Sequence, residues 1–375
     1  MRKRNLLLLL LLLILLAAAV WIALSLFGDT EENVQMSEPE SAAVSEKEPE
    51  TMQRMYSEKI TDIFKHCTRV IERDEGYYPV RFSDARLENY QSFPVMPYAG
   101  CSAGITMEFS TDEPTISFTY ENIRTIWDSK FDIIENGELT ETIEIGNNKW
   151  GYVEYTRRVT DGPSDLVICL PTASETAISD LHLGNFKTDV TGDRTKLLVL
   201  GDSISQGLFG SSPSRNWPFL LAQKQGLDYL NLSVGGETFR SGALDPDIGY
   251  APDYIIVALG TNDLFQTRYI NVIERDIADY LERLNKIYPE TPVTLITPFG
   301  FLGMNAASNM FNSDQVEAVY EVICRQAERF GYSVIDGREL FPGTKEYYAL
   351  NDSVHLSSLG FEAVADSLDR ILQIR

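Results

Sequence analysis

The chain has 375 residues, which is enough for two domains that each bury a core, and its formal net charge is −23 at pH 7. Such an acidic chain is not expected to bind nucleic acid, because that function needs clustered Lys and Arg to neutralise phosphates. The three histidines, His66, His182 and His355, lie far apart, so we expect neither a histidine-based metal site nor a cofactor.

The N-terminal residues predict a membrane anchor. A basic stretch at residues 2–4 precedes an apolar block of 22 residues, Leu6–Phe27, which is long enough as a helix to cross a bilayer. A cleaved signal peptide has a shorter apolar stretch followed by small residues, whereas the cluster Ala17–Ala19 lies inside the block. We therefore expect an uncleaved signal anchor over residues 1–28, with cleavage as the alternative. The basic flank is expected in the cytoplasm and the rest of the chain outside the cell.

The next two segments differ in composition and in the spacing of their apolar residues. Residues 29–51 contain eight acidic side chains and one lysine, Lys47, so they predict an extended acidic linker. Residues 52–74 repeat apolar side chains at helical spacing and predict one amphipathic helix. We expect this helix to pack on the following domain, with a self-association surface as the alternative, and His66 to lie at its surface or boundary.

Residues 75–190 predict an antiparallel, jelly-roll-like β-sandwich. Short apolar runs there alternate with polar residues, and Asn136-Gly137 is typical of a tight hairpin turn. The expected strands are 105–109, 116–120, two strands within 131–141, 152–159 and 166–170. Trp127, Trp150 or Tyr155 could stack on sugars from such a sandwich, although core packing is the more common role of each.

The four cysteines, at positions 67, 101, 169 and 324, lie far apart and form no C-x-x-C pair. An extracellular location permits disulfides, but Cys169 falls in an apolar run and Cys324 in an expected helix. Buried free thiols are therefore favoured over disulfides.

Beyond Thr195 the pattern becomes strand, loop and helix, repeated. We expect strands at 197–200, 229–232, 254–259, 293–296 and 333–335, and helices near 216–225, 271–288, 314–330 and 357–372. This alternation predicts an α/β domain over residues 195–375, with a parallel sheet of about five strands and helices on both faces.

Polar residues follow the strands of this sheet. They are Ser203 in Gly-Asp-Ser, the pair Gly235-Gly236, Asn262 in Gly-Thr-Asn-Asp, and Asp352 with His355. Each group alone also suits a turn or a helix cap. Because right-handed crossovers bring the carboxyl ends of parallel strands to one edge, we expect all four groups to lie together there.

These four groups, in this order, resemble the motif blocks of the SGNH/GDSL hydrolase superfamily over about residues 195–375. The resemblance implies a flavodoxin-like parallel sheet and, by the family's spacing after Asn231, favours Gly236 over Gly235 in the second block. A sandwich that precedes such a domain also resembles two-domain carbohydrate acetylesterases, although that likeness rests on domain order. The α/β-hydrolase family is excluded, since its G-x-S-x-G motif requires glycine where this chain has Ser205.

Acyl transfer needs a hydroxyl, a base, a group that orients the base, and donors for the oxyanion. Ser203 is the expected nucleophile, and His355 is the expected base because no other histidine follows residue 182. Asp352, three residues earlier, is expected to orient the imidazole, with capping of the helix near Ser357 as the alternative. The expected oxyanion donors are the backbone N–H groups of Ser203 and Gly236 and the side-chain amide of Asn262. Asp202 is expected to brace its own turn.

The sequence thus predicts a single-pass, membrane-anchored extracellular serine esterase. It would hydrolyse short-chain acyl esters, in particular O-acetyl esters, on a carbohydrate or another small ester through an acyl-Ser203 intermediate. Two alternatives stay open: a polysaccharide O-acetyltransferase that uses the same residues, and a non-catalytic surface protein that binds glycan.

Overall fold

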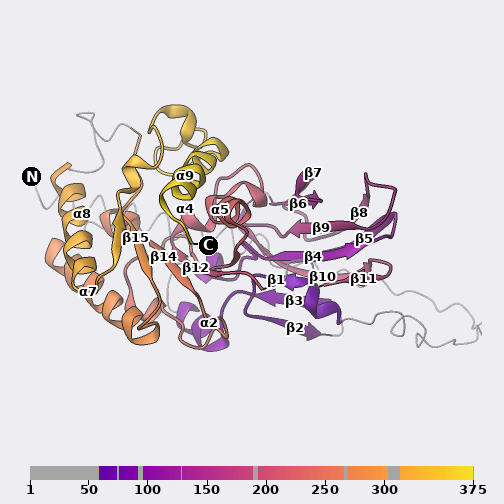
Figure 1. Cartoon of the computed structure of the whole chain (residues 1–375), viewed down its shortest axis with the longest axis horizontal. Coiled ribbons are helices and arrows are strands. Elements are labelled where there is room, and N and C mark those ends of the chain that lie inside the picture. Colours follow the sequence, from indigo (N-terminus) through magenta and orange to yellow (C-terminus); the bar gives the residue numbers. More distant parts are fainter. Residues whose placement is uncertain are drawn as a thin grey trace, which may run out of the picture. The chain divides into compact units, whose positions relative to one another are not determined.

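The computed structural model describes residues 59–73, 76–91, 96–127, 129–188, 193–265, 269–302 and 313–374 (Figure 1). The predicted anchor at 1–28, the acidic linker at 29–51 and residues 52–58 of the predicted helix lie outside these ranges. Within them, no helix is both long and apolar enough to span a bilayer.

Residues 59–73 form strands, so the predicted helix over 52–74 is wrong for this part of the chain. A 3₁₀ turn, η1 (Ile60–Ile63), leads into β1 (Phe64–Lys65) and then into β2 (Arg69–Arg73). The backbone of His66 between them has a φ of 60°, which no right-handed helix accommodates. The apolar residues of this segment are spaced in a way that suits a helix as well as strands. Pairing with neighbouring strands and packing into a shared core decide in favour of strands.

Residues 59–187, here called the two-sheet region, contain two antiparallel sheets. The first has the order β1-β4-β9-β6-β7, with β11 on β4, and the second has the order β2-β3-β10-β5-β8. The remaining bounds are β3 Gly76–Val80, β4 Thr106–Thr111, β5 Thr115–Thr125, β6 Ser129–Glu135, β7 Glu138–Gly146, β8 Trp150–Thr156, β9 Ser164–Cys169, β10 Ser174–His182 and β11 Phe186–Lys187. Facing side chains of both sheets form one apolar cluster, in which the rings of Phe118 and Phe131 lie 5.4 Å apart.

The expected hairpin joins β6 and β7. Asn136 and Gly137 occupy its turn with φ values of 51° and 83°. Both residue types tolerate positive φ, so this sequence prediction is confirmed. Two short helices, α2 (Asp84–Gln91) and α3 (Met96–Ala99), interrupt the strands of the region.

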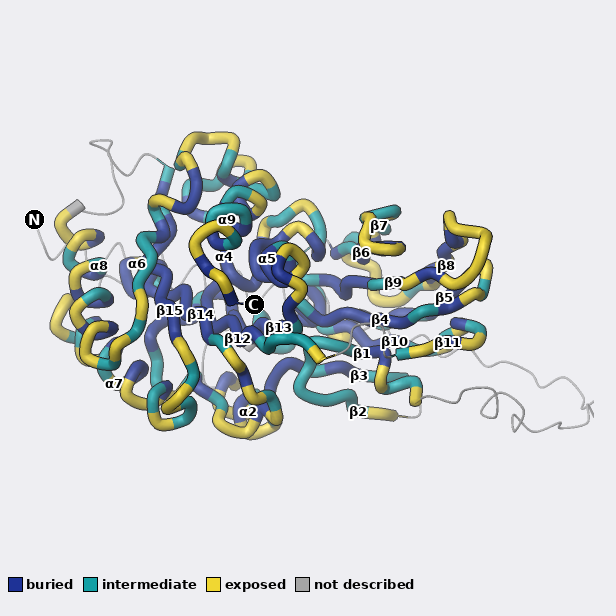
Figure 2. The backbone as a smooth tube through the Cα atoms, in the orientation of Figure 1, coloured by how far each residue is buried: buried dark blue, intermediate teal, exposed yellow. Residues whose placement is uncertain are grey.

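Residues 193–374, here called the α/β region, form the predicted parallel sheet with the order β13-β12-β14-β15-β16. The strands are β12 Lys196–Gly201, β13 Asp228–Asn231, β14 Tyr254–Ala258, β15 Val293–Ile296 and β16 Ser333–Ile335. The helices are α4 Ser203–Gln206, α5 Trp217–Gln225, α6 Thr261–Phe265, α7 Ile270–Ile287, α8 Ser313–Glu328 and α9 Ser358–Ile371. Helix α5 packs on α9 and α7 packs on α8 (Figure 1). The backbones of β12, β14 and β15 are almost entirely buried (Figure 2), as expected for a parallel sheet covered on both faces.

Buried polar side chains join the two regions. Arg81, only 2% exposed, donates to the carbonyl oxygens of Asn231 and Ser233 at 3.1 and 2.7 Å. Asp132 of β6 accepts hydrogen bonds from the backbone N–H and the hydroxyl of Ser214 at 2.8 and 2.5 Å. Because the partners of each group come from both regions, separating the regions would leave these groups buried without hydrogen bonds.

His66 is another such junction residue; of its two predicted positions, surface or boundary, the surface one is wrong. Its side chain is 7% exposed and lies 3.0 Å from Glu108 Oε1 and 3.2 Å from Asp228 Oδ1. All four cysteines are free thiols, with Cys101 and Cys169 buried and Cys67 and Cys324 half-buried. Burial raises the pKa of the Cys101 thiol to about 12, which keeps it protonated.

Candidate active site

Ser203 lies at the carboxyl end of β12, on the first turn of α4. Asp202 caps that turn, because its carboxylate accepts the backbone N–H of Ile204 at 3.0 Å. This bears out the expectation that Asp202 braces its own turn. Burial raises the pKa of Asp202 to about 7, although the hydrogen bond from Ile204 N–H works in the opposite direction. Ser203 itself is 9% exposed, so its hydroxyl sits at the edge of a buried turn.

Asp352 and His355 lie on one turn just before α9. The Asp352 carboxylate accepts the backbone N–H groups of Val354 and His355 through Oδ1, at 2.7 and 2.9 Å. Its Oδ2 lies 2.9 Å from His355 Nδ1. The helix cap is instead Ser357, whose hydroxyl accepts the N–H of Gly360. The capping alternative for Asp352 therefore does not apply.

Burial alone would raise the pKa of Asp352. The backbone N–H groups of His355 and Val354 and the His355 imidazole outweigh that effect and lower the pKa below its ordinary value. Asp352 is therefore a carboxylate at neutral pH, and it can hold His355 in the tautomer that carries its proton on Nδ1.

The other imidazole nitrogen reaches the serine. His355 Nε2 lies 2.9 Å from Ser203 Oγ, although the two residues are 152 positions apart. The side chains of His355 and Asp352 are 21% and 23% exposed, so the base lies at a partly open surface. The sheet thus brings together the hydroxyl, the base and the orienting carboxylate that the sequence predicted.

The second loop offers one candidate oxyanion donor. Gly235 donates its N–H to Gln206 Oε1 at 2.7 Å, and Glu237 donates its N–H to Val234 O at 3.0 Å. Gly236 lies between these two engaged groups and has a φ of 83°, which glycine adopts without strain. Of the two glycines left open by the residues, Gly236 is therefore the better placed to donate to a ligand.

Asn262 belongs to α6 and reaches the same loop. Its amide nitrogen donates to the carbonyl oxygen of Glu237 at 2.9 Å, and an amide nitrogen carries a second hydrogen for a further acceptor. Asp263, next in the chain, accepts the backbone N–H of Phe239 at 3.2 Å and so anchors this loop. The three loops that carry Ser203, Gly236 and Asn262 are therefore connected by hydrogen bonds.

Two residues near the site were missed from the sequence. Gln206 ties Gly235 to Tyr98 O, at 2.7 and 3.0 Å, and its position one helical turn after Ser203 was a usable signal. Phe209 packs against the His355 ring with centroids 4.3 Å apart, is 44% exposed and has a φ of 68°. Nothing in the sequence indicated this, because bulky aromatic residues rarely adopt positive φ.

The three aromatic residues considered for sugar stacking have different surroundings. Trp127 lies beside Phe209, with ring centroids 5.0 Å apart. Trp150 is 73% exposed on the outer strand β8. Tyr155 is buried at 3% exposure and donates its hydroxyl to Glu135 at 2.8 Å, so it is a core residue.

Comparison with known proteins agrees with this geometry. Residues 199–363 match the family model described as the GDSL-like lipase/acylhydrolase family, which spans Ser203, Gly236, Asn262, Asp352 and His355. No curated protein matches the chain.

Solved structures share the fold at low sequence identity. The salicylyl-acyltransferase SsfX3 from a tetracycline biosynthetic pathway has a TM-score of 0.72 and 20% identity, over 83% of this chain and 96% of that one. The acetyl xylan esterase Est2A from Butyrivibrio proteoclasticus has a TM-score of 0.54 and 16% identity, over 83% and 98%. A carbohydrate esterase family 2 enzyme with a carbohydrate binding domain from Corynascus thermopiles has a TM-score of 0.53 and 16% identity, over 78% and 97%.

Each likeness covers more of the chain than the α/β region alone, so the combination of both regions recurs in these structures. Together with the motif blocks, the matched family model supports a GDSL-like lipase/acylhydrolase domain over residues 199–363.

Proposed function

We propose that the protein hydrolyses O-acetyl esters on a carbohydrate, with Ser203 as nucleophile, His355 as base and Asp352 as the group that orients the base. The observation that carries the proposal is the pair of 2.9 Å contacts that join Ser203 Oγ to His355 Nε2 and His355 Nδ1 to Asp352. This arrangement suits nucleophilic acyl transfer, because the imidazole can take the serine proton while the carboxylate stabilises the resulting imidazolium.

The reaction follows from these contacts. Ser203 Oγ attacks the acetyl carbonyl carbon while His355 Nε2 takes the hydroxyl proton, and the carbonyl oxygen becomes an oxyanion. The N–H groups of Ser203 and Gly236 and the Asn262 amide stabilise that charge. The bond from carbon to the sugar oxygen then breaks as His355 returns its proton to that oxygen. Water, deprotonated by His355, cleaves the acyl-Ser203 ester, releases acetic acid and regenerates the serine.

The names of two proteins with a similar fold support a carbohydrate substrate. One is an acetyl xylan esterase and the other a family 2 carbohydrate esterase, and both match across most of this chain. At 16% identity, both are similarities of fold. The two-sheet region, which packs next to the site, is proposed as an accessory sandwich that helps to bind the sugar.

The test compares wild type with Ser203→Ala on an O-acetylated xylo-oligosaccharide and on ethyl acetate, with release of acetic acid followed by titration at constant pH. We expect the variant to lose at least about 10³-fold in kcat on both substrates, since the nucleophile is removed. Ser333→Ala removes an exposed hydroxyl at the start of β16 and serves as the control for ethyl acetate. Equal acetate release by wild type and Ser203→Ala would overturn the proposal.

A second candidate function is acyl transfer to a sugar hydroxyl instead of water. The similarity in fold to a salicylyl-acyltransferase, at a TM-score of 0.72, favours considering it. Both reactions share the acyl-Ser203 intermediate and differ in the acceptor. Incubation with an acetyl donor and an unacetylated oligosaccharide separates them: an acetylated oligosaccharide detected by mass spectrometry indicates a transferase, and free acetate alone indicates an esterase.

We further propose that the esterase is held at the outer face of a membrane by Leu6–Phe27. The basic residues before this block and its apolar length, interrupted only by Ser25, support this orientation. The full chain is then expected to stay in the membrane fraction after an alkaline carbonate wash and to be cut by protease added to intact cells. Release of the full chain by the wash, or its resistance to external protease while lysed cells allow cleavage, would contradict the anchored orientation.

A further inference from the structure

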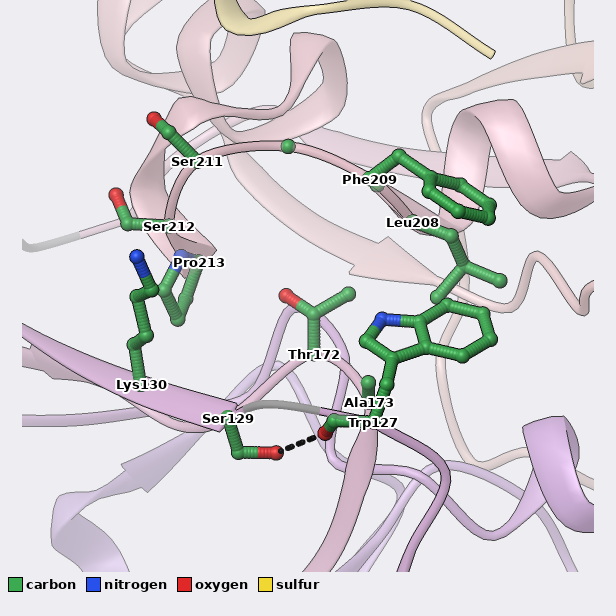
Figure 3. Close-up of a pocket in the computed structure, with 12 residues that line it drawn as sticks. Trp127, Ser129, Lys130, Thr172, Ala173, Leu208, Phe209, Ser211, Ser212 and Pro213 are labelled. Carbon is green, nitrogen blue, oxygen red and sulfur yellow. Dashed lines mark hydrogen bonds between the residues drawn. The ribbon is translucent and has the colours of Figure 1, made fainter. Parts of the chain in front are cut away.

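A pocket lies between the two regions, next to the proposed catalytic triad (Figure 3). Trp127 of the two-sheet region and Phe209 of the α/β region stand on one side of it. Lys130 and Ser212 stand on the other side, with Thr172 between the two walls. The pocket therefore has one aromatic wall and one polar wall, and both regions contribute to it.

The aromatic wall extends directly to the base. The rings of Trp127 and Phe209 have centroids 5.0 Å apart, and those of Phe209 and His355 have centroids 4.3 Å apart. Tyr98 lies behind Trp127 at 5.9 Å. A ligand on this wall would therefore lie on the histidine side of Ser203.

The chemistry of the reaction says which part of the ester belongs on that side. His355 must give its proton to the leaving oxygen, so the alcohol part of the ester has to lie next to the imidazole. The carbonyl oxygen points the other way, toward Gly236 and Asn262. A pocket whose wall begins at the His355 ring is thus suited to the alcohol part rather than to the acyl group.

Phe209 holds its place in this wall in an unfavourable backbone conformation. It is a bulky residue with a φ of 68°, in the left-handed region that side chains of this size avoid. The residue is nevertheless 44% exposed, so burial in the core does not account for the conformation. The conformation instead holds the ring between His355 and Trp127, with one part open to a ligand.

The polar wall matches the edge of a sugar ring. Lys130 bonds to Glu144 at 2.9 Å, but an ammonium has three donors and can also reach a hydroxyl. Thr172 lines the pocket between the two walls, and its buried Oγ1 has no hydrogen-bond partner among the described residues, which marks this part of the lining as polar. A pyranose presents C–H groups on its face and hydroxyls on its edge. The face would fit the aromatic wall and the edge would fit the polar wall.

We propose that this pocket binds the sugar ring that carries the ester, with its face on Trp127 and Phe209 and its hydroxyls toward Lys130 and Ser212. The inference rests on the proposed function and specifies its leaving-group subsite. In the acylation step, the bond from the carbonyl carbon to the sugar oxygen breaks and the proton on His355 Nε2 moves to that oxygen. The free sugar then leaves this pocket while the acetyl group stays on Ser203.

The experiment uses two substrates with the same acetyl group and different alcohols. These are an O-acetylated xylo-oligosaccharide and ethyl acetate, whose ethyl group presents no ring to stack on Trp127. For Trp127→Ala we expect kcat/KM to fall about tenfold or more on the oligosaccharide and to stay within about twofold of wild type on ethyl acetate. Trp127→Phe keeps a stacking face and is expected to recover most of the oligosaccharide activity.

Trp150→Ala is the matched control, since it removes an indole that is 73% exposed on β8. It is expected to behave as wild type on both substrates. Equal losses on oligosaccharide and ethyl acetate in Trp127→Ala would overturn the sugar assignment, as would a loss on the oligosaccharide confined to Trp150→Ala. A larger effect of Trp127→Ala on ethyl esters of bulky acids than on the oligosaccharide would assign the pocket to the acyl group instead.

The two proposals fail in different ways. If wild type cleaves ethyl acetate and Ser203→Ala does not, the esterase mechanism stands, and Trp127→Ala alone decides the subsite. If wild type releases acetate from neither substrate, the proposed function is overturned and the subsite with it.

Discussion

Asp352 serves two purposes with one carboxylate. Its Oδ1 accepts two backbone N–H groups of the turn that leads to His355, and its Oδ2 faces His355 Nδ1. The first set of contacts shapes the turn, and the second fixes the tautomer of the imidazole. These purposes can be separated, because an amide oxygen can replace Oδ1 whereas an amide NH₂ cannot accept from Nδ1–H.

In Asp352→Asn we therefore expect the turn before His355 to be retained. The His355 tautomer with its proton on Nδ1 is expected to be lost. With its proton moved to Nε2, His355 can no longer accept one from Ser203, and kcat on ethyl acetate should fall by about 10³ to 10⁴. Steady-state kinetics and a thermal melt measure the two effects. Asp247→Asn, at an exposed carboxylate, is the control with expected wild-type values. A loss smaller than tenfold in folded Asp352→Asn would argue against its orienting role.

On the scale of elements, helix α2 supports the loop that carries Gly236. Arg86 and Tyr90 of this helix reach Glu237, the residue after Gly236, at 3.4 and 2.8 Å. Arg240 approaches the same carboxylate at 3.0 Å, and Asn262 donates to the Glu237 carbonyl oxygen. A helix of the two-sheet region thus helps to position the proposed oxyanion donors through a buried ionic cluster.

Glu237→Gln tests this support. The side chains of Arg86 and Glu237 are 3% and 6% exposed, so the variant leaves a buried guanidinium without its counter-charge. We expect a loss of about 3 kcal/mol or more in the free energy of unfolding, measured in urea. Glu121→Gln breaks an exposed contact with Lys149 at 3.9 Å and should change stability by less than about 0.5 kcal/mol. Similar small changes in both variants would mean that the cluster does not support the loop.

The elements that the sequence predicted well are those in which local pattern and tertiary environment agree. The near-continuous apolar runs 197–200 and 293–296 are buried strands, and Asn136-Gly137 is a hairpin turn. Residues 60–71 were misassigned because Ile63, Phe64 and Val70 fit one helix face as well as they fit paired strands. Only long-range pairing with β3 and β4 decides between the two.

At the site, residue types with a chemical requirement could be predicted and residues that act through packing could not. The motif residues Ser203, Asp352 and His355 meet in the structure because parallel strands end at one edge. Phe209 and Trp127 come together only when the two regions pack, and their separation in sequence carries no signal. The sequence pointed to Trp127 as one of three candidates, and its neighbours in space distinguish it from Trp150 and Tyr155.

On the scale of the whole molecule, His66 joins the regions with a charge. It lies between Glu108 of β4 and Asp228 at the start of β13. Burial alone would lower the pKa of His66, but the neighbouring carboxylates of Asp228 and Glu108 outweigh it and raise the pKa from 6.5 to about 9. Burial alone would raise the pKa of Glu108, but His66 lowers it to about 2. The ion pair therefore exists across neutral pH and couples the two-sheet region to the α/β region.

The two shifts define a pH window for the stability of this junction. A histidine whose folded pKa is raised contributes its full stabilisation below pH 6.5 and loses it as the pH rises through about 9. A glutamate whose folded pKa is lowered contributes above pH 4.5 and loses its share as the pH falls through about 2. The pair is thus most stabilising between pH 4.5 and 6.5, on the order of 3 kcal/mol when the interaction is counted once.

His66→Asn removes the charge and retains a residue type that tolerates the positive φ at this position. We expect urea unfolding at pH 5.5 to show the variant less stable than wild type by on the order of 3 kcal/mol, and the difference to shrink by pH 10. His182→Asn, at a histidine that is 59% exposed, should match wild type within about 0.5 kcal/mol at both pH values. A deficit in His66→Asn that is equal at both pH values would show that packing, rather than the charge of His66, holds the two regions together.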